Sequence, residues 1–268
     1  MTFEIQAHRG ARAFYPENTL QAFCKAADLG CRVIELDLVV SRDHRIVVSH
    51  DPWAFVSDAG GASSRRYLFS MDYEEIARLD CGTVSPEFPF QERIVAGRPT
   101  LSDVFRSVEG HLRQIGRPDE MVYNLEVKSW PERDGQAHPS PSDYAALVIG
   151  EISASGLGDR VRLQSFDDRI LTEAKKIMPG LCYGLLVEDP VVLDSFPGKP
   201  GFVPEYVNPK LNLVDEAMLS TLHGFGAKVV VWTVNRTEDM ARMKMLGADG
   251  LITDHPEIAL HLPELAGS

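Results

Sequence analysis

The chain alternates between short apolar runs and longer amphipathic segments over almost all of its 268 residues. Short apolar runs bounded by turn residues are typical of buried strands, and an apolar period of 3.6 residues is typical of helices. Strands that alternate with helices build a parallel sheet covered by helices. About eight such strands can be identified, which favours a closed (β/α)8 barrel of the TIM type over an open, doubly wound sheet. The sequence contains no GxGxxG or GxxxxGK[ST] phosphate loop, which weakens the open-sheet alternative further.

The predicted elements follow one another along the whole chain. Strands are expected at Glu4–Ala7, around Glu35 and Asp37, and at Met121–Lys128, Val161–Phe166, Cys182–Val187, Glu205–Pro209, Lys228–Val234 and Gly250–Thr253. Helices are expected at Pro16–Gly30, Leu101–His111, Ser142–Ser155, Asp168–Met178, Asp215–Phe225 and Thr237–Leu246, with a short last helix from Pro256. In the first helix, Asn18 is the expected N-cap and Gly30 the expected stop.

The length fits one barrel domain spanning residues 1–268. Residues 52–100 interrupt the alternation, because they contain a Gly-Gly pair, several prolines and the adjacent Arg65 and Arg66. One short helix is expected there, at Met71–Leu79. A segment this long between barrel elements predicts an insertion over the active site. Arg65 and Arg66 then either face a substrate or lie on the surface.

Two acidic residues, Glu35 and Asp37, lie within an apolar run. Residues two apart in a strand point to the same face, so the two carboxylates are expected side by side on a buried face. Buried like charges are unfavourable unless something positive lies between them. A hard divalent cation such as Mg²⁺ or Ca²⁺, which takes oxygen ligands, would remove the conflict.

A tight turn at residues 41–44 follows, and then Ile46–Val48 leads to His50 and Asp51. The connection is too short for a crossover helix, so the pattern predicts an antiparallel hairpin. The hairpin brings His50 back toward the level of the two acids.

Polar side chains collect at the predicted ends of the barrel strands, where barrel enzymes place catalytic groups. Besides Glu35 and Asp37 these are His8, Arg9, Glu126, Lys128, Gln164, Ser165, Trp232, Thr233, Asn235, Thr253 and Asp254. Glu126 and Lys128 are again two apart and share a face. The carboxylates of Glu35, Asp37 and Glu126, without Cys–His zinc spacing, indicate one Mg²⁺ or Ca²⁺ ion rather than structural zinc.

A divalent ion beside Arg9 and Lys128 would make a positive pocket that suits a phosphate group. His8 and His50 suit general acid–base work near neutral pH. Phosphodiester cleavage needs such a set. A base activates a hydroxyl, an acid protonates the leaving alcohol, and cations stabilise the charge that develops at phosphorus.

The formal net charge of −12 argues against non-specific nucleic-acid binding, which needs a basic surface. It also disfavours electrostatic docking on an anionic membrane. No secretory leader is recognisable, and no apolar run approaches the ~20 residues that span a bilayer. A cytoplasmic location is therefore the default expectation. Cys24, Cys31, Cys81 and Cys182 lack CxxC spacing and are expected to be buried free thiols.

Several short motifs occur in order along nearly the whole chain. They are His8-Arg9-Gly10, Pro16-Glu17-Asn18-Thr19, Glu35-Leu36-Asp37, His50-Asp51, 124–128 (NLEVK), 164–166 (QSF), 232–235 (WTVN) and 249–254 (DGLITD). Together, at these spacings, they resemble the motif series of the glycerophosphodiester phosphodiesterase family.

The resemblance implies a TIM-type barrel with a small insertion after the His50-Asp51 motif. It implies hydrolysis of a small-molecule glycerophosphodiester to an alcohol and sn-glycerol 3-phosphate. In the mechanism proposed for such enzymes, the glycerol 2-hydroxyl attacks phosphorus, and water then opens the cyclic phosphate.

The resemblance also implies roles for individual residues. It places Glu35, Asp37 and Glu126 on the divalent ion, His8 and His50 as the catalytic pair, and Arg9 and Lys128 on the phosphate. We expect His50 to be the acid for the leaving group and His8 the base. Trp232 either flanks the glycerol or packs in the structure.

Two alternatives stay open beside this function. One is lysophospholipase D-like activity on bulkier lipid phosphodiesters, with the insertion presenting an apolar groove. The other is a non-catalytic barrel that binds a phosphodiester intact. Such a barrel would be expected to lack a histidine or an acid, whereas every expected position is filled. The head group, the choice between Mg²⁺ and Ca²⁺ and the oligomeric state are left open by the sequence.

Overall fold

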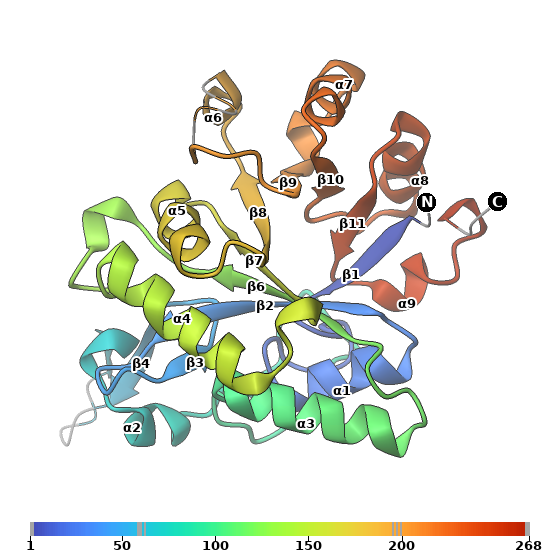
Figure 1. The fold of residues 1–268 in the computed structure, drawn as a ribbon. Helices are drawn as coiled ribbons and strands as arrows, with labels where there is room; N and C mark the ends of the chain where they lie inside the picture. The colour runs from blue at the N-terminus through green and yellow to red at the C-terminus, as the bar shows by residue number, and fades with distance from the viewer. Residues whose placement is uncertain are drawn as a thin grey trace.

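The computed structural model describes residues 3–57, 61, 63–194, 196, 198 and 200–265. Within them, eight parallel strands form a closed ring, and the long helices lie around its outside (Figure 1). The ring closes because β1 (Glu4–His8) pairs in parallel with β2 (Val33–Val40) on one side and with β11 (Gly250–Thr253) on the other. The predicted TIM-type (β/α)8 barrel is confirmed.

The other elements of the barrel lie close to their predicted positions. From β2 onward the ring contains β6 (Val122–Val127), β7 (Val161–Ser165), β8 (Cys182–Val187), β9 (Tyr206–Pro209) and β10 (Lys228–Val231). The outer helices are α1 (Leu20–Asp28), α3 (Leu101–Gln114), α4 (Pro141–Ser155), α5 (Asp168–Ile177), α7 (Glu216–Gly224) and α8 (Thr237–Leu246). Shorter helices are α6 (Val191–Asp194), α9 (Pro256–Ala259), η2 (Pro131–Arg133), η3 (Gly158–Arg160), η4 (Leu211–Leu213) and η5 (Pro263–Leu265).

The expectation that Asn18 caps the first helix is wrong. Thr19 has extended backbone angles, and its hydroxyl accepts a hydrogen bond from the Ala22 amide at 3.2 Å, so Thr19 is the N-cap of α1. Asn18 has a positive φ of 58° and is only 4 % exposed. Both residue types cap helices well. Because Thr19 takes the cap, the Asn18 side chain is free to hydrogen-bond inside the barrel mouth.

The predicted hairpin after β2 is present. β3 (Ile46–Val48) runs antiparallel to the end of β2, with Leu38 opposite Val48. The Ser49 amide then donates a hydrogen bond to the Asp37 carbonyl at 3.0 Å. His50 therefore returns to the carboxyl end of β2, as the short connection predicted.

Residues 52–100 fold against this hairpin. The segment contains β4 (Trp53–Ser57), β5 (Ser63–Tyr67), η1 (Leu68–Ser70) and α2 (Tyr73–Ala77), which is the predicted short helix. Its buried Leu68, Met71 and Ile76 pack in one cluster with Val39 of β2 and Val47 of β3.

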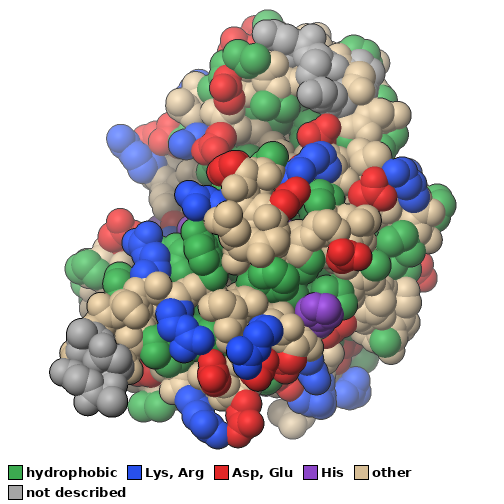
Figure 2. Space-filling model, turned by 90° about the vertical axis from the view of Figure 1, so that its left-hand side faces the viewer, with side chains coloured by type: hydrophobic (Ala, Val, Ile, Leu, Met, Phe, Trp, Pro, Cys, Tyr) green, Lys and Arg blue, Asp and Glu red, His purple; other side chains and the backbone are tan. Residues whose placement is uncertain are grey.

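Arg65 and Arg66 lie on β5, away from the barrel mouth. The Arg65 guanidinium carbon lies 3.8 Å from the ring centre of Trp53, and Arg66 Nη2 lies 3.6 Å from a Glu75 oxygen. Neither arginine lines the central pocket. The structure thus favours a surface role for both. On the face in Figure 2, the described basic and acidic side chains are interspersed, with no extended area of one sign.

Gly10 is required by the close approach of the loop after β1 to α1. Its φ is +86°, and a Cβ built there would lie 2.7 Å from the carbonyl carbon of Ala22. We expect Gly10→Ala to lower the free energy of unfolding by about 3 kcal/mol, from the left-handed backbone and the clash together. Gly156→Ala is the matched control, because Gly156 has a φ of +71° but nothing within 4 Å. This control should lower the free energy of unfolding by only about 1 kcal/mol in denaturant titration. Equal losses for the two variants would contradict the clash assigned at Gly10.

A buried carboxylate outside the barrel mouth makes the stability depend on pH. Glu109 of α3 accepts hydrogen bonds from the Tyr123 hydroxyl and Arg160 Nη1, each at 2.7 Å, and is 8 % exposed. Burial alone would raise the pKa of Glu109, but the bonds from Arg160 and Tyr123 outweigh it and lower the pKa. The folded protein therefore binds this proton less readily than the unfolded chain does.

The stability contributed by Glu109 should be fully present above the ordinary carboxyl pKa and lost as the pH falls through the lower folded value. Near neutral pH we expect Glu109→Gln to be less stable than the original protein by about 2 kcal/mol. The gap between the two should shrink as chemical denaturation is repeated from about pH 7 toward about pH 3. A gap that is constant across this range would refute the lowered pKa.

Candidate active site

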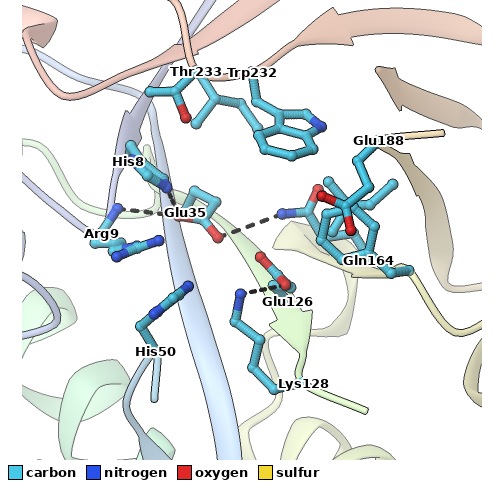
Figure 3. A pocket seen from close by; sticks show the side chains of 13 residues that line it. His8, Arg9, Glu35, His50, Glu126, Lys128, Gln164, Glu188, Trp232 and Thr233 are labelled. Carbon is cyan, nitrogen blue, oxygen red and sulfur yellow. Dashed lines mark hydrogen bonds and ion pairs between the residues drawn. The ribbon is translucent and has the colours of Figure 1, made fainter. Parts of the chain in front are cut away.

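The carboxyl ends of the barrel strands surround one central cavity of about 200 Å³. Its lining contains seven of the predicted site residues: His8, Arg9, Glu35, His50, Glu126, Lys128 and Trp232. The eighth, Asp37, is fully buried beside them. Figure 3 shows Glu35 in the middle, with His8 and Arg9 on one side and Gln164 on the other. The structure thus brings all eight residues together at the end of the barrel where catalytic groups are expected.

Strand register explains why the acids converge. Across the β2–β6 pair Asp37 lies opposite Glu126, and across the β1–β2 pair Glu35 lies opposite His8. Carboxylate oxygens of Glu35, Asp37 and Glu126 all lie within 4.8 Å of one another, and each residue is at most 7 % exposed. Three oxygen donors at this spacing could hold one divalent metal ion.

Two cations partly neutralise this cluster. Lys128 Nζ hydrogen-bonds to Glu126 and lies 2.9 Å from Asp37 Oδ1, and Arg9 Nε lies 3.1 Å from Asp37 Oδ2. Asp37 Oδ1 nevertheless has no hydrogen-bond partner of good geometry, although it is buried. Three carboxylates against two cations leave one negative charge in excess. The excess charge, and an Asp37 oxygen held by an ion pair without a hydrogen bond, both fit a bound cation.

The acids differ in the proton affinity that their surroundings give them. Burial, then the charges of Asp37 and Glu126, raise the pKa of Glu35 well above its ordinary value. Burial would also raise the pKa of Asp37, but Lys128 and Arg9 outweigh it and hold that pKa well below its ordinary value. Among the described residues, Glu35 accepts hydrogen bonds only from the Arg9 backbone amide at 3.1 Å and the Gln164 side-chain amide at 3.5 Å. It is therefore the acid whose charge is least compensated by the protein.

Several residues outside the predicted set hold the site in place. Asn18 Nδ2 donates to Asp37 Oδ2 at 2.7 Å, and Glu17 accepts two bonds from Arg9 Nη1 at 2.9 and 3.0 Å. Both belong to the Pro16–Thr19 motif. The sequence predicted a helix cap for Asn18 and not this bond to Asp37. Asn208 Nδ2 donates to Gln164 Oε1 at 2.7 Å, which leaves the Gln164 amide nitrogen to face Glu35.

Asp254 orients His8. Its Oδ1 lies 2.7 Å from His8 Nδ1, and its Oδ2 accepts a bond from Asn235 Nδ2 at 2.7 Å. A proton on Nδ1 leaves Nε2 as the acceptor of the ring. Burial, then the charge of Arg9, lower the pKa of His8, although Asp254 acts in the opposite direction. A neutral imidazole with a free acceptor nitrogen can serve as a general base. The sequence placed Asp254 at a strand end without this role.

His50 has a more open environment. Its side chain is 38 % exposed, and Nδ1 lies 3.0 Å from Asp51 Oδ1. The hydrogen bond from His50 lowers the pKa of Asp51, which thus stays a carboxylate that can orient the imidazole. His50 lines the central cavity and two others beside it.

Trp232 forms part of the wall opposite Lys128 (Figure 3). Its indole nitrogen donates to the Asn208 carbonyl at 2.7 Å, and its ring meets Phe166 edge to face with centroids 5.5 Å apart. The Trp232 ring thus packs against its neighbours and also borders the cavity, so a packing role and a position beside the substrate are compatible.

Comparison with known proteins gives the class of this enzyme. Residues 8–258 match the Glycerophosphoryl diester phosphodiesterase family. With this match, the barrel and its site define a phosphoric diester hydrolase. The chain belongs to the glycerophosphoryl diester phosphodiesterase family.

Individual relatives span nearly the whole chain. A glycerophosphodiester phosphodiesterase of Caldanaerobacter subterraneus subsp. tengcongensis is 33 % identical over 271 residues, which cover 98 % of each protein. A putative glycerophosphoryl diester phosphodiesterase from Silicibacter pomeroyi has a solved structure that is similar with a TM-score of 0.82 at 26 % identity, covering 97 % of this chain and 93 % of that one. An Oleispira antarctica phosphodiesterase in complex with the product sn-glycerol-3-phosphate shares the fold, with a TM-score of 0.74 at 20 % identity and coverage of 95 % and 94 %.

Two further observations concern membrane-spanning helices and the cysteines. Among the described residues, no helix is both long and apolar enough to cross a membrane. Cys24, Cys31, Cys81 and Cys182 are free thiols, as predicted, but only Cys31 is buried, and the expected burial of the other three is wrong because they are half-exposed.

Proposed function

We propose that this enzyme hydrolyses glycerophosphodiesters to an alcohol and sn-glycerol 3-phosphate, with a divalent cation and two histidines. The observation that carries the proposal is the cavity itself. It is bordered by an acidic cluster with an excess negative charge, by Arg9 and Lys128, and by His8 and His50. Acid–base groups and cations around one cavity suit cleavage at phosphorus.

In this proposal, Glu35, Asp37 and Glu126 hold the cation, which is Mg²⁺ or Ca²⁺ because the ligands are oxygen atoms. When bound, it supplies Lewis-acid stabilisation of charge on phosphate and hydroxyl oxygens. Arg9 and Lys128 bind the phosphate. His8, held by Asp254, removes the proton of the attacking glycerol 2-hydroxyl. His50 gives a proton to the leaving alcohol, and water then opens the resulting cyclic phosphate to sn-glycerol 3-phosphate. Trp232 flanks the glycerol.

We also propose that residues 1–268 form a single domain in which residues 52–100 are an insertion bordering the site. Asp80, Cys81, Thr83 and Arg98 of this segment line a cavity of about 240 Å³ that shares His50. A reducing compartment, the cytoplasm, would suit the four free thiols.

The test is metal removal with product identification. After treatment with a chelator and dialysis, release of glycerol 3-phosphate from glycerophosphocholine should fall to the level without enzyme. Adding back Mg²⁺ or Ca²⁺ in separate samples should restore it and identify the ion. Unchanged turnover by the metal-free protein would refute the requirement for a metal ion. Formation of glycerol and phosphocholine would show that a different phosphoester bond is cleaved from the one proposed. Faster choline release from lysophosphatidylcholine than from glycerophosphocholine would favour the bulkier lipid substrate instead.

A further inference from the structure

The proposed base His8 and the phosphate-binding Arg9 are adjacent in the chain and lie on the same side of Glu35 (Figure 3). Each of them is held by a carboxylate from another part of the chain. Asp254 Oδ1 lies 2.7 Å from His8 Nδ1, and Glu17 Oε2 lies 2.9 Å from Arg9 Nη1. The positions of the base and of the phosphate ligand therefore depend on where these two carboxylates lie.

One guanidinium group joins the two carboxylates. Arg12 Nη1 donates a hydrogen bond to Asp254 Oδ1 at 3.2 Å, and Arg12 Nη2 lies 2.8 Å from Glu17 Oε2. The Arg12 side chain is 17 % exposed, and it does not line the catalytic cavity. A planar guanidinium can meet two carboxylates at once with different nitrogen atoms, whereas the ammonium group of a lysine is a single point charge. Arg12 therefore fixes the spacing between Asp254 and Glu17.

Arg12 also helps to keep Asp254 ionised. Asp254 is only 4 % exposed, and burial alone would raise its pKa. The bond from His8, the charge of His8 and the charge of Arg12 outweigh burial and lower the pKa of Asp254. An ionised Asp254 accepts the hydrogen bond from His8 Nδ1, and this bond leaves Nε2 as the acceptor of the ring. The bridging guanidinium thus supports the form of Asp254 that orients the base.

The proposed insertion contacts Arg12 in two ways. Phe88 is 5 % exposed, and the Arg12 guanidinium carbon lies 4.9 Å from its ring centre, in the range of a cation–π contact. The Gln91 side-chain amide donates a hydrogen bond to the Arg12 carbonyl at 2.8 Å. The Glu92 backbone amide donates to the carbonyl of Phe14 in the same loop, also at 2.8 Å. This part of the insertion therefore holds both the side chain of Arg12 and the backbone around it.

We propose that Arg12 is a positioning residue: by bridging the two carboxylates, it holds His8 and Arg9 at a fixed spacing. The inference rests on the proposed function, which makes these two groups the base and a phosphate ligand. Their spacing matters because a hydroxyl attacks phosphorus efficiently only when base, hydroxyl and phosphate are aligned. The inference also gives residues 88–92 of the insertion a task in the reaction, since they hold the Arg12 guanidinium against the two carboxylates.

The test is chemical rescue of Arg12→Ala. We expect kcat/KM for glycerophosphocholine to fall by about 30-fold, because a small displacement of catalytic groups is enough for such a loss. Millimolar guanidinium ion should then raise kcat/KM at least about fivefold, since it can lie between the two carboxylates. Methylammonium at the same concentration has the same charge but a single nitrogen atom, and it should restore little. A residue that only stabilised the fold would not be replaced in this way, because guanidinium weakens folding.

Arg160→Ala is the matched control. The Arg160 side chain is 19 % exposed and also joins two carboxylates, those of Glu109 and Asp119, but it lies outside the catalytic cavity. Its loss should also lower Tm, while kcat/KM of the folded protein should stay unchanged with and without guanidinium. Arg12→Lys keeps the charge but not the planar fork, so its kcat/KM should stay at least about fivefold below that of the original protein.

A mutant cycle tests the path through the carboxylates. When Glu17→Gln and Asp254→Asn are already present, Arg12→Ala should lower the single-turnover rate by only about twofold more. Phe88→Leu gives an independent measurement, because it leaves every charge in place. It should lower kcat/KM by about threefold in the original protein and have no further effect in Arg12→Ala.

Three results would overturn the inference. They are unchanged activity of Arg12→Ala or Arg12→Lys, a loss that guanidinium restores no better than methylammonium, and a loss of full size when both carboxylates are already replaced. Unchanged activity of Phe88→Leu would overturn the task given to the insertion. Failure of the original protein to hydrolyse glycerophosphocholine with either divalent ion would instead refute the proposed function, and the inference with it.

Discussion

Replacing His50 with alanine is expected to lower kcat for glycerophosphocholine by about 10³-fold, because the leaving alkoxide loses its proton donor. The loss should depend on the leaving group. An aryl alcohol such as p-nitrophenol leaves as a stable anion and needs little protonation. We therefore expect His50→Ala to retain most of its activity on the p-nitrophenyl ester of glycerol 3-phosphate. Single-turnover rates with both esters are the measurement, since they isolate the chemical step.

His8→Ala provides the contrast within the same site. If His8 is the base, it acts on the attacking hydroxyl, and its loss should slow both esters by a similar factor of about 10³. His223→Ala is the control, because His223 is 39 % exposed, much like His50, but lies on α7 outside the cavity. Equal losses on both esters for His50→Ala would exclude it as the acid. The reverse pattern for the two variants would exchange their roles.

Glu126→Gln is expected to lower kcat/KM by about 100-fold or more and to abolish stabilisation by the divalent ion. The change keeps the size of the side chain but removes one of three converging charges. In the original protein, millimolar Mg²⁺ or Ca²⁺ should raise Tm, because the ion binds only the folded state. In the variant this rise should disappear.

Glu109→Gln is the matched control for Glu126→Gln, because the two glutamates are 8 % and 7 % exposed, and Glu109 lies outside the site. It should lower Tm without removing the shift that the ion produces. A full ion-dependent shift in Glu126→Gln would show that the ion does not bind at the acidic cluster. Comparison of the Tm shifts with catalytic rates separates loss of the ion from loss of the fold.

The fold could be predicted from the sequence because each strand and helix has its own apolar period, and eight strands of this kind close most simply as a barrel. The acidic cluster could be predicted for a similar reason. Glu35 and Asp37 share a face by the two-residue period, and Asp37 then meets Glu126 through parallel register. The first is a local rule that a single strand already obeys, and the second follows once the two strands pair.

Contacts made by loops were harder to predict. Asn and Thr both cap helices well, so the sequence does not decide whether Asn18 or Thr19 begins the helix. The fold shows that Thr19 does, and that Asn18 bonds to Asp37 instead. Asp254 lies 246 residues from His8 along the chain, and its partner is fixed only when the ring closes through β1 and β11.

The pairing of Asp37 with Glu126 and of Glu35 with His8 has a consequence for how such an enzyme can change. A slip of one residue between neighbouring strands would turn every one of these side chains to the opposite surface of the sheet. The arrangement of the catalytic groups therefore depends on the register of the paired strands and hardly at all on the helices around them. Substitutions on those helices should alter the thermal stability of the enzyme, while the reaction catalysed by each folded molecule stays the same.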